Sequence, residues 1–340
     1  MRIFSGIQPT GRKHLGNYIG AITQYVAAQD RGEGIFCIVD LHATTVPYEP
    51  AELRARLYDT AAILLAAGLD PERCIFFRQG DVAEHTELTW LLSSVTAYGD
   101  LNRMHQFKEK SGAQRDLVPA SLFTYPVLMA ADVLAYRAHE VPVGDDQRQH
   151  IELMRDIAQR FNARFPDPRT GAGPLVVPEG RYREVGARIM DLQAPDRKMS
   201  TTGGTEQGTV LVLDTPKTIE KKFKSAVTDS GSEVRRAPDK PGVSNLIEIL
   251  AAVRGVKPNQ IESELENARY GDLKVAVSSA VINYLQPVHE RYEQLRADEP
   301  ALEAIFQQGA SAARAIAAHT LADVRELMGV GMPRRTQPIR

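Results

Sequence analysis

The chain has 340 residues, of which 43% are hydrophobic and 25% are charged, and its formal net charge at pH 7 is -2. This length and composition are typical of a soluble protein with one large domain, a smaller one and a well-buried core. The near-neutral charge excludes a globally basic nucleic-acid-binding chain, so a polyanion would have to meet a local basic patch.

The first 160 residues alternate between strand-like and helix-like patterns. Continuous apolar runs predict strands at residues 2–7, 34–41 and 73–79, and helical spacing predicts helices at 16–29 and 50–68. Further helical patterns lie at about 84–96, 121–135 and 146–162. The β-α-β-α-β order with buried strands predicts an α/β fold, a doubly wound, Rossmann-like parallel sheet with helices on both faces.

Strand patterns end after residue 215. Residues 166–183 are rich in Pro, Gly and Arg and predict an irregular excursion. Helical patterns with Pro or Gly breaks then follow at 216–227, 243–253, 258–268, 271–295 and in an Ala-rich end. We therefore predict an α/β domain at residues 1–205 and an all-helical domain at 206–340, whose last helices can pack back on the first domain.

Two features bear on the compartment. Cys37 and Cys74 are the only cysteines, and neither has a second cysteine at ligand spacing, so we expect two buried free thiols in a reducing cytoplasm and no metal site. The N-terminus lacks the apolar core of a signal peptide, and the run at 61–69 is too short to span a bilayer. We expect no membrane partner.

A glycine-containing loop, "QPTGRKHLGNYIG" (8–20), joins the first predicted strand to the first helix. Ligands bind at this edge in open α/β sheets, and a helix N-terminus favours phosphate. Asn17 stands where a P-loop needs lysine, which excludes that motif. His14 and Asn17 either donate hydrogen bonds to a triphosphate or simply cap the helix.

Carboxylates mark two further segments. In "VPVGDDQ" (141–147), Asp145 and Asp146 are predicted to occupy a first helical turn after Gly144. Either the helix dipole favours these carboxylates there, or they bind a ribose or amine together with Gln147. Asp132 lies in the otherwise apolar helix at 124–136 and needs a partner. That partner is Arg137, a backbone N–H, or the N–H of a ligand.

Two lysine-bearing segments are candidates for phosphate contact. The segment "RMHQFKEK" (103–110) has two interpretations: it brings Lys108 or Lys110 to a phosphate, or its charged side chains form a solvated face. "DRKMSTTGG" (196–204) is typical of an exposed, mobile loop that closes over a phosphate, or of a plain surface turn.

Taken in order, "QPTG…HLGN", "VDLHA", "TYPVLMAAD", "VPVGDDQRQH", "KMSTT" and "SAVTDS" resemble the tryptophanyl-tRNA synthetases, which are class I aminoacyl-tRNA synthetases. "HLGN" takes the place of the HIGH signature, and "KMSTT" that of KMSKS. The resemblance implies activation of L-tryptophan by ATP, with Mg2+ bound to ATP and no dedicated protein cage, and transfer to tRNA(Trp). It also implies a cytoplasmic homodimer in which the helical part holds the anticodon end of the tRNA.

The same resemblance assigns site residues. Those expected to contact ATP are Gln8, Pro9, Thr10, His14, Gly16, Asn17, Gly144, Asp145, Asp146, Ile189, Lys198, Met199, Ser200, Thr201 and Thr202. The expected catalytic residues are Lys198, Lys110, Ser200 and Thr201. Asp132 is expected to accept the indole N–H; the residues expected around tryptophan are Phe4, Val39, His42, Met129 and Val143 at the indole, and Tyr125 and Gln147 at the α-amino group.

The chain departs from the family pattern at Thr201, where the motif has a second lysine, and in the longer excursion at 166–183. Three alternatives stay open: a tyrosyl-tRNA synthetase, a nucleotidyltransferase of the same superfamily, and a non-catalytic tryptophan-binding paralogue. Lys221 and Lys222, in the predicted helix at 216–227, are expected to belong to a basic patch that contacts tRNA.

Overall fold

The computed structural model describes residues 1–104, 118–182, 189–201 and 203–332. Its central element is a parallel sheet in the order β3-β2-β1-β4-β5. The strands are β1 (Arg2–Ile7), β2 (Glu33–Ile38), β3 (Cys74–Arg78), β4 (Glu140–Val143) and β5 (Glu179–Tyr182). The order changes direction between β1 and β4, which places the topological switch point at the end of β1.

Successive side chains of the strands enter opposite cores, as the period of two requires. Ile3 and Phe36 belong to a first buried cluster, and their neighbours Phe4 and Ile35 belong to a second. The helices over the first face are α1 (Leu15–Asn17), η1 (Tyr18–Ile22), α2 (Thr23–Ala28) and α4 (Pro50–Ala66). Those over the second are α5 (Glu84–Ser93), α6 (Tyr98–Asn102), α8 (Ala120–Leu134) and α9 (Arg148–Arg164). The doubly wound parallel sheet is confirmed.

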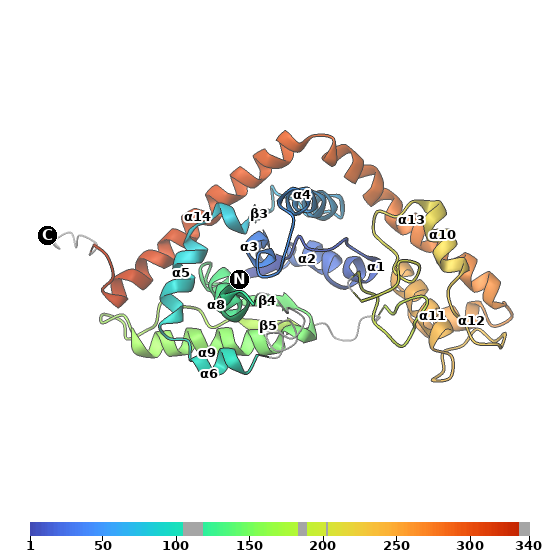
Figure 1. Cartoon of the computed structure of the whole chain (residues 1–340), viewed down its shortest axis with the longest axis horizontal. Helices are drawn as coiled ribbons and strands as arrows, with labels where there is room; N and C mark the ends of the chain where they lie inside the picture. Colours follow the sequence, from blue (N-terminus) through green and yellow to red (C-terminus); the bar gives the residue numbers. More distant parts are fainter. Residues whose placement is uncertain (105–117, 183–188, 202, 333–340) are drawn as a thin grey trace.

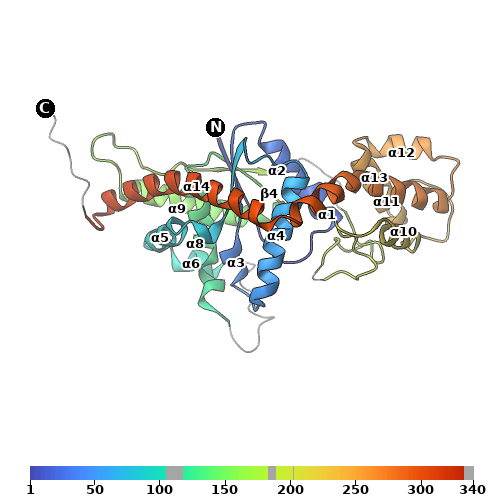
Figure 2. The same ribbon diagram turned by 90° about the horizontal axis from the view of Figure 1, so that it is seen from above.

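The helical part begins with α10 (Pro216–Lys224), α11 (Pro241–Arg254) and α12 (Pro258–Glu264). These helices form a group at one end of the molecule (Figures 1 and 2). The two long helices α13 (Tyr270–Arg296) and α14 (Glu299–Met328) then run back over α4 toward the sheet (Figure 1). No described helix is long and apolar enough to cross a membrane.

The edge strand β3 is covered by α14. Phe306 of α14 lies in the first buried cluster, whereas Ala310 and Ala313 lie in the second, so the helix passes from one face of the sheet to the other at this edge. A Cβ added to Gly309 would overlap with the backbone carbonyl oxygen of Phe76. Covering an edge strand with a helix protects its unpaired backbone groups, and glycine permits the close approach.

Three predicted elements differ from the structure. The segment 166–183 is not wholly irregular, because its last residues form β5 beside β4. The strand predicted at 34–41 ends at Ile38, and Asp40–Ala43 form the short helix α3. The predicted helix at 16–29 contains one wider, π-helical turn at η1.

Candidate functional site

Four chain segments meet the carboxyl edge of the sheet. The glycine-containing loop follows β1, α3 follows β2, the turn η2 (Gln79–Asp81) follows β3, and η3 (Asp145–Gln147) follows β4. Parallel strands end at the same edge, so all four segments surround the switch point.

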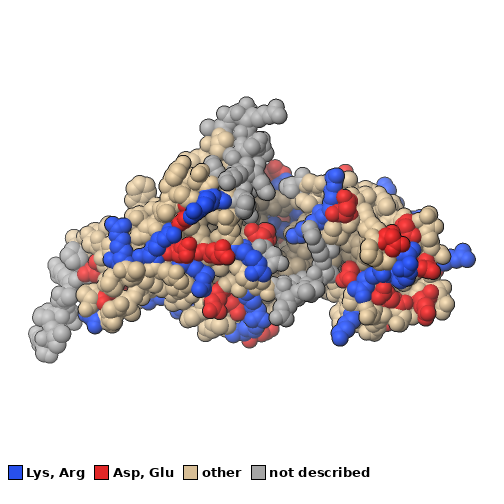
Figure 3. All heavy atoms as spheres, turned by 90° about the horizontal axis from the view of Figure 1, so that it is seen from below, with Lys and Arg blue, Asp and Glu red and all other residues tan. Residues whose placement is uncertain are grey.

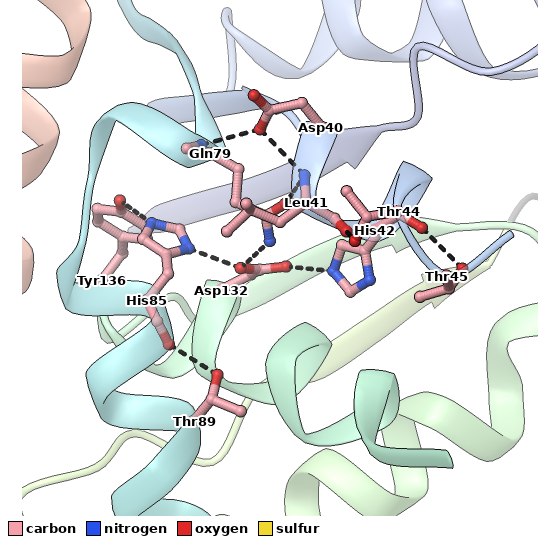
Figure 4. Close-up of polar contacts among 11 residues, drawn as sticks. Asp40, Leu41, His42, Thr44, Thr45, Gln79, His85, Thr89, Asp132 and Tyr136 are labelled. Atoms are coloured by element: carbon pink, nitrogen blue, oxygen red, sulfur yellow. Dashed lines mark hydrogen bonds and ion pairs between the residues drawn. The ribbon is translucent and has the colours of Figure 1, made fainter. Parts of the chain in front are cut away.

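A buried polar cluster lies behind this edge, centred on Asp132 of α8 (Figure 4). Its carboxylate is 2% exposed. It accepts from Nε2 of His42 at 2.8 Å, from Nδ1 of His85 at 2.6 Å and from Nε2 of Gln79 at 2.6 Å. Burial would raise the pKa of Asp132, but the hydrogen bonds from His42 and His85 outweigh burial and hold the pKa well below its usual range. The carboxylate is therefore ionised at neutral pH.

Of the partners considered for Asp132, Arg137 is not the one observed. Arg137 pairs instead with Asp323 of α14. Of the actual donors, only His42 was assigned to the site from the sequence, while Gln79 and His85 were missed. The available signal was weak: a glutamine directly after a buried strand, and a histidine in the first turn of an amphipathic helix.

The residues predicted around tryptophan fall into two groups. The first surrounds Asp132: the rings of His42 and Tyr125 meet edge to face at 6.2 Å between centroids, and Val39 directly precedes α3. Phe4 is buried in the same core, where Met129 and Val143 pack as partly buried side chains. The second is Gln147, whose amide donates to Asp146 at 2.7 Å. The roles of these residues stay predictions.

His14 and Asn17 form a reciprocal cap at the start of α1. The backbone N–H of Asn17 donates to Nδ1 of His14 at 3.3 Å, and that of His14 donates to the Asn17 side-chain oxygen at 3.2 Å. Burial, together with the charges of Lys198 and Lys13, lowers the pKa of His14 to about 4. The imidazole is neutral at pH 7, and because Nδ1 accepts, its proton is on Nε2.

The "KMSTT" segment lies against this loop. A Cβ on Gly11 would be 3.0 Å from Oγ1 of Thr201, and one on Gly16 would be 3.5 Å from Cβ of Ile189. The N–H of Met199 donates to the carbonyl of Ile189 at 3.0 Å. The structure therefore brings together the predicted ATP residues that follow β1 and those of the "KMSTT" segment.

One expectation about the "KMSTT" segment changes. Lys198 and Thr201 are exposed as predicted, but Met199 is 1% exposed, with its side chain in the first core cluster, so only its backbone is left for a ligand. The buried Asp191 ties the segment together at its base, accepting from the backbone N–H groups of Gln193 at 2.8 Å and Thr205 at 3.2 Å. Thr202, Lys108 and Lys110 lie outside the described residues, as does the side chain of Asp145.

Asp145 and Asp146 do not occupy the first turn of an α-helix. They lie in the short turn η3, and α9 begins only at Arg148, after Gln147.

In the described part of the chain, no group of three or more His, Cys, Asp and Glu side chains is placed to hold a metal ion. Cys37 is buried as expected, whereas Cys74 is only half-buried.

The fold and the site first define a class: doubly wound α/β proteins, in which ligands typically bind where the strand order changes, here beside β1. Within that class the chain belongs to the family described as tRNA synthetases class I (W and Y), whose model matches residues 1–286.

Individual relatives agree. The chain is 48% identical to a tryptophan–tRNA ligase of Oceanobacillus iheyensis (97% of this chain, 98% of the relative) and 46% identical to tryptophan–tRNA ligase 2 of Streptomyces avermitilis (96% of each). Among solved structures, the tryptophanyl-tRNA synthetase of Mycoplasma pneumoniae is 34% identical with a TM-score of 0.85, covering 97% of this chain and 98% of that one. The Campylobacter jejuni enzyme, solved with ADP and tryptophan, is 32% identical with a TM-score of 0.83, covering 97% and 100%.

Proposed function

We propose that this chain is a tryptophan–tRNA ligase that forms tryptophanyl-adenylate and diphosphate from L-tryptophan and ATP, then transfers tryptophan to the 3' end of tRNA(Trp). The observation that carries the proposal is the ionised, buried Asp132 beside aromatic rings at the switch point. A carboxylate in this state only accepts hydrogen bonds, so it fits a bulky aromatic ligand with an N–H. Relatives named tryptophan–tRNA ligase at 44–48% identity support the same substrate.

In the first step, the carboxylate of tryptophan attacks the α-phosphorus of ATP in line, and diphosphate leaves. The protein's contribution is to position the two substrates and to stabilise the charge that develops on the phosphates. The neutral His14 presents Nε2–H as a donor, while Lys198, on the segment that meets the loop after β1, supplies a full charge. Mg2+ enters with ATP and neutralises phosphate charge.

The test is the exchange of labelled pyrophosphate into ATP driven by single amino acids. We expect tryptophan to support exchange and phenylalanine to be rejected by roughly 10⁴-fold, because a site built around an N–H leaves its acceptor unpaired with phenylalanine. Replacing Asp132 with Ala should erode this discrimination as well as affinity. Exchange driven by tyrosine but not tryptophan would indicate a tyrosyl-tRNA synthetase, and no exchange at all would indicate a non-catalytic paralogue.

For the tRNA we propose a contact on α10, with the helical domain starting at residue 206. Lys222 is excluded from such a contact because it is 4% exposed and its ammonium bonds Asp214 and the carbonyl of Thr209, each at 2.7 Å. Lys217, Lys221 and Lys224 are exposed instead, and their spacing places them on one face. Acidic and basic side chains are mixed on the face of the molecule in Figure 3, so tRNA binding would depend on such local groups.

Reversing the charge of Lys217, Lys221 and Lys224 together should weaken tRNA charging and reduce its dependence on salt, since each lost phosphate contact lowers counterion release. Pyrophosphate exchange should be unchanged, because it needs no tRNA. The control is reversal of a single charge at Lys257, an exposed lysine directly before α12. Unchanged charging and salt dependence in the triple variant would remove this face from the proposal.

We also infer a cytoplasmic homodimer. Two of the most exposed aromatic side chains, Trp90 at 79% and Tyr98 at 72%, belong to the consecutive helices α5 and α6. Tyr98 lies against Phe123 of α8 with ring centroids 5.3 Å apart. Aromatic side chains are enriched in the buried centres of protein interfaces, so we assign this aromatic surface (Trp90, Tyr98 and Phe123) to contact with a second copy of the chain.

A further inference from the structure

The donors around Asp132 come from three elements that are distant in sequence (Figure 4). His42 belongs to α3, Gln79 to η2 and His85 to α5, while Asp132 itself projects from α8. All four side chains are buried. The cluster therefore ties together the ends of β2 and β3 and two of the helices that cover the second face, α5 and α8.

A carboxylate offers about four acceptor positions, two on each oxygen. Oδ1 receives two donors, from Gln79 and His85, and Oδ2 receives one, from His42. Within the described part of the chain, one acceptor position is thus left, and it lies on Oδ2, the oxygen that faces His42. The donors to Oδ1 fix the rotation of the carboxylate and so determine where this last position points.

The orientation of His85 is in turn fixed from its other side. Its Nδ1 donates to Asp132, so its Nε2 must accept, and the hydroxyl of Tyr136 lies 2.6 Å from Nε2. The ring of Tyr136 stacks on Phe4 with centroids 5.5 Å apart and an angle of 11° between the planes. The carboxylate of Asp132 thus requires the proton of His85 on Nδ1, and the hydroxyl of Tyr136 donates to Nε2 and fixes the orientation of the ring.

Gln79 is oriented in the same manner. Its side-chain oxygen accepts the backbone N–H of Leu41 at 3.1 Å, which leaves the amide nitrogen to face Asp132. The neighbouring Asp40 accepts the N–H of Gly80 at 2.8 Å and that of Leu41 at 3.1 Å. These bonds link the end of β2 to the end of β3. Gln79 cannot turn its oxygen toward Asp132 without losing the bond that this oxygen accepts from the N–H of Leu41.

We propose that Gln79 and His85 are positioning residues for amino-acid selection, and that Tyr136 acts through His85: together they direct the remaining acceptor position of Asp132 at the indole N–H of tryptophan. This inference rests on the proposed function, since it concerns the same substrate. Gln79, His85 and Tyr136 would then contribute to the discrimination by Asp132 without contacting the substrate themselves.

The test compares tryptophan with its benzothiophene analogue, in which sulfur replaces the indole N–H and the ring shape is nearly kept. The readout is the ratio of kcat/KM for the two amino acids in pyrophosphate exchange. Losing a hydrogen bond to a charged group changes such a ratio by about 10- to 100-fold. We expect His85→Leu and Gln79→Met to lower the preference for tryptophan by about tenfold or more, with kcat/KM for the analogue and the KM of ATP nearly unchanged.

Two further variants separate positioning from simple loss of packing. His85→Asn keeps an N–H near the place of Nδ1 and should retain more of the preference than His85→Leu. Tyr136→Phe keeps the ring and removes only the hydroxyl, so it should reduce the preference by roughly 2- to 10-fold, the effect of one neutral hydrogen bond. It stays informative if His85→Leu fails to fold.

Thr89→Ala is the matched control, because its hydroxyl bonds only the backbone carbonyl of His85 at 2.7 Å among the contacts in Figure 4. Its preference should equal that of the parent. The inference is overturned if Gln79→Met and Tyr136→Phe keep the parental ratio, or if their kcat/KM falls equally for both amino acids. A parent chain that does not use tryptophan at all would instead contradict the proposed function.

Discussion

Thr201 is the residue at which the chain departs from the KMSKS motif that it otherwise resembles. Its hydroxyl lies beside Gly11, in the loop after β1, and Lys198 is exposed on the same segment. A neutral hydroxyl replaces a full positive charge, and losing one such donor to developing charge costs about 3 kcal/mol, or on the order of 10²-fold in rate. We therefore expect Lys198 to carry more of the charge stabilisation at the leaving diphosphate.

We expect Lys198→Ala to slow adenylate formation by about 10²-fold or more. Thr201→Lys should change the same rate by less than about tenfold, because we expect Lys198 and the Mg2+ that would enter with ATP to compensate for the missing charge. Single-turnover adenylate formation measures both variants. Adenylate formation at the parental rate by Lys198→Ala would show that this segment is not catalytic in this chain.

His14 predicts a dependence of stability on pH. The folded state lowers the pKa of His14 to about 4, while an unfolded histidine has a pKa near 6.5. Between these values the unfolded chain binds more protons than the folded chain, so stability is fully present above about pH 6.5 and is lost as the pH falls toward 4.

The variant His14→Asn keeps a capping side chain and removes this titration. Between pH 7.5 and pH 5, the free energy of unfolding of the parent should fall by up to about 2 kcal/mol more than that of His14→Asn. Urea unfolding at both pH values measures the two changes. Equal pH slopes for parent and His14→Asn would contradict the assignment.

The site was predictable from the sequence only where its residues follow a strand or belong to a motif. The need of Asp132 for a partner follows from its burial alone. The identity of the partners does not, because the three donors lie 90, 53 and 47 residues away along the chain. Arg137, the cation nearest in sequence, follows α8 in a conformation with φ of 51° and turns to Asp323.

At the scale of elements, Gly309 determines how α14 crosses the edge strand. An alanine there should force α14 away from Phe76, since a Cβ has no room beside the carbonyl oxygen. We expect Gly309→Ala to destabilise the protein by about 1–3 kcal/mol, as other overpacked contacts do, even though alanine favours helices. Urea unfolding measures the difference.

Gly271 provides the matched control within α13. It is exposed, and a Cβ there would meet nothing within 4 Å. Gly271→Ala should therefore stabilise the protein by roughly 0.5–1 kcal/mol, the gain expected when alanine replaces glycine in a helix. If Gly309→Ala stabilises the protein as Gly271→Ala does, the contact between Gly309 and β3 is not a determinant of the fold.

Elements with a strong apolar period were predictable, including the first three strands and the long helices. β5 was not, because "EGRY" has a half-buried, polar pattern and becomes a strand only by pairing with β4. The end of β2 was also misjudged: the apolar run continues through Leu41, but Asp40 accepts the N–H of Gly80 and turns the chain into α3. Such tertiary bonds are not visible in periodicity.

At the scale of the whole molecule, the aromatic surface predicts self-association. Trp90 is the only tryptophan of the chain and is 79% exposed, so intrinsic tryptophan fluorescence reports on this surface alone. We expect its emission to shift to shorter wavelength as the protein concentration rises through the dimer dissociation constant, because burial removes water from the ring.

Sedimentation should show a dimer for the parent and weaker association for Trp90→Ala. Tyr48→Ala, at an aromatic that is 46% exposed outside this surface, is the control. A dimer in sedimentation without any change in Trp90 emission would place the interface on another face.

The cover that α14 forms over β3 also sets an order of events during synthesis. The strand is finished at Arg78, but the helix that covers it starts at Glu299, so roughly 220 residues are made between them, which takes about 10–45 s at ordinary elongation rates. During this interval the nascent chain exposes the edge of its first apolar strands on the ribosome. The edge of β3 is thus covered only after α14 has been made, and a product truncated before Glu299 would leave the ribosome with this edge open to aggregation or to chaperones.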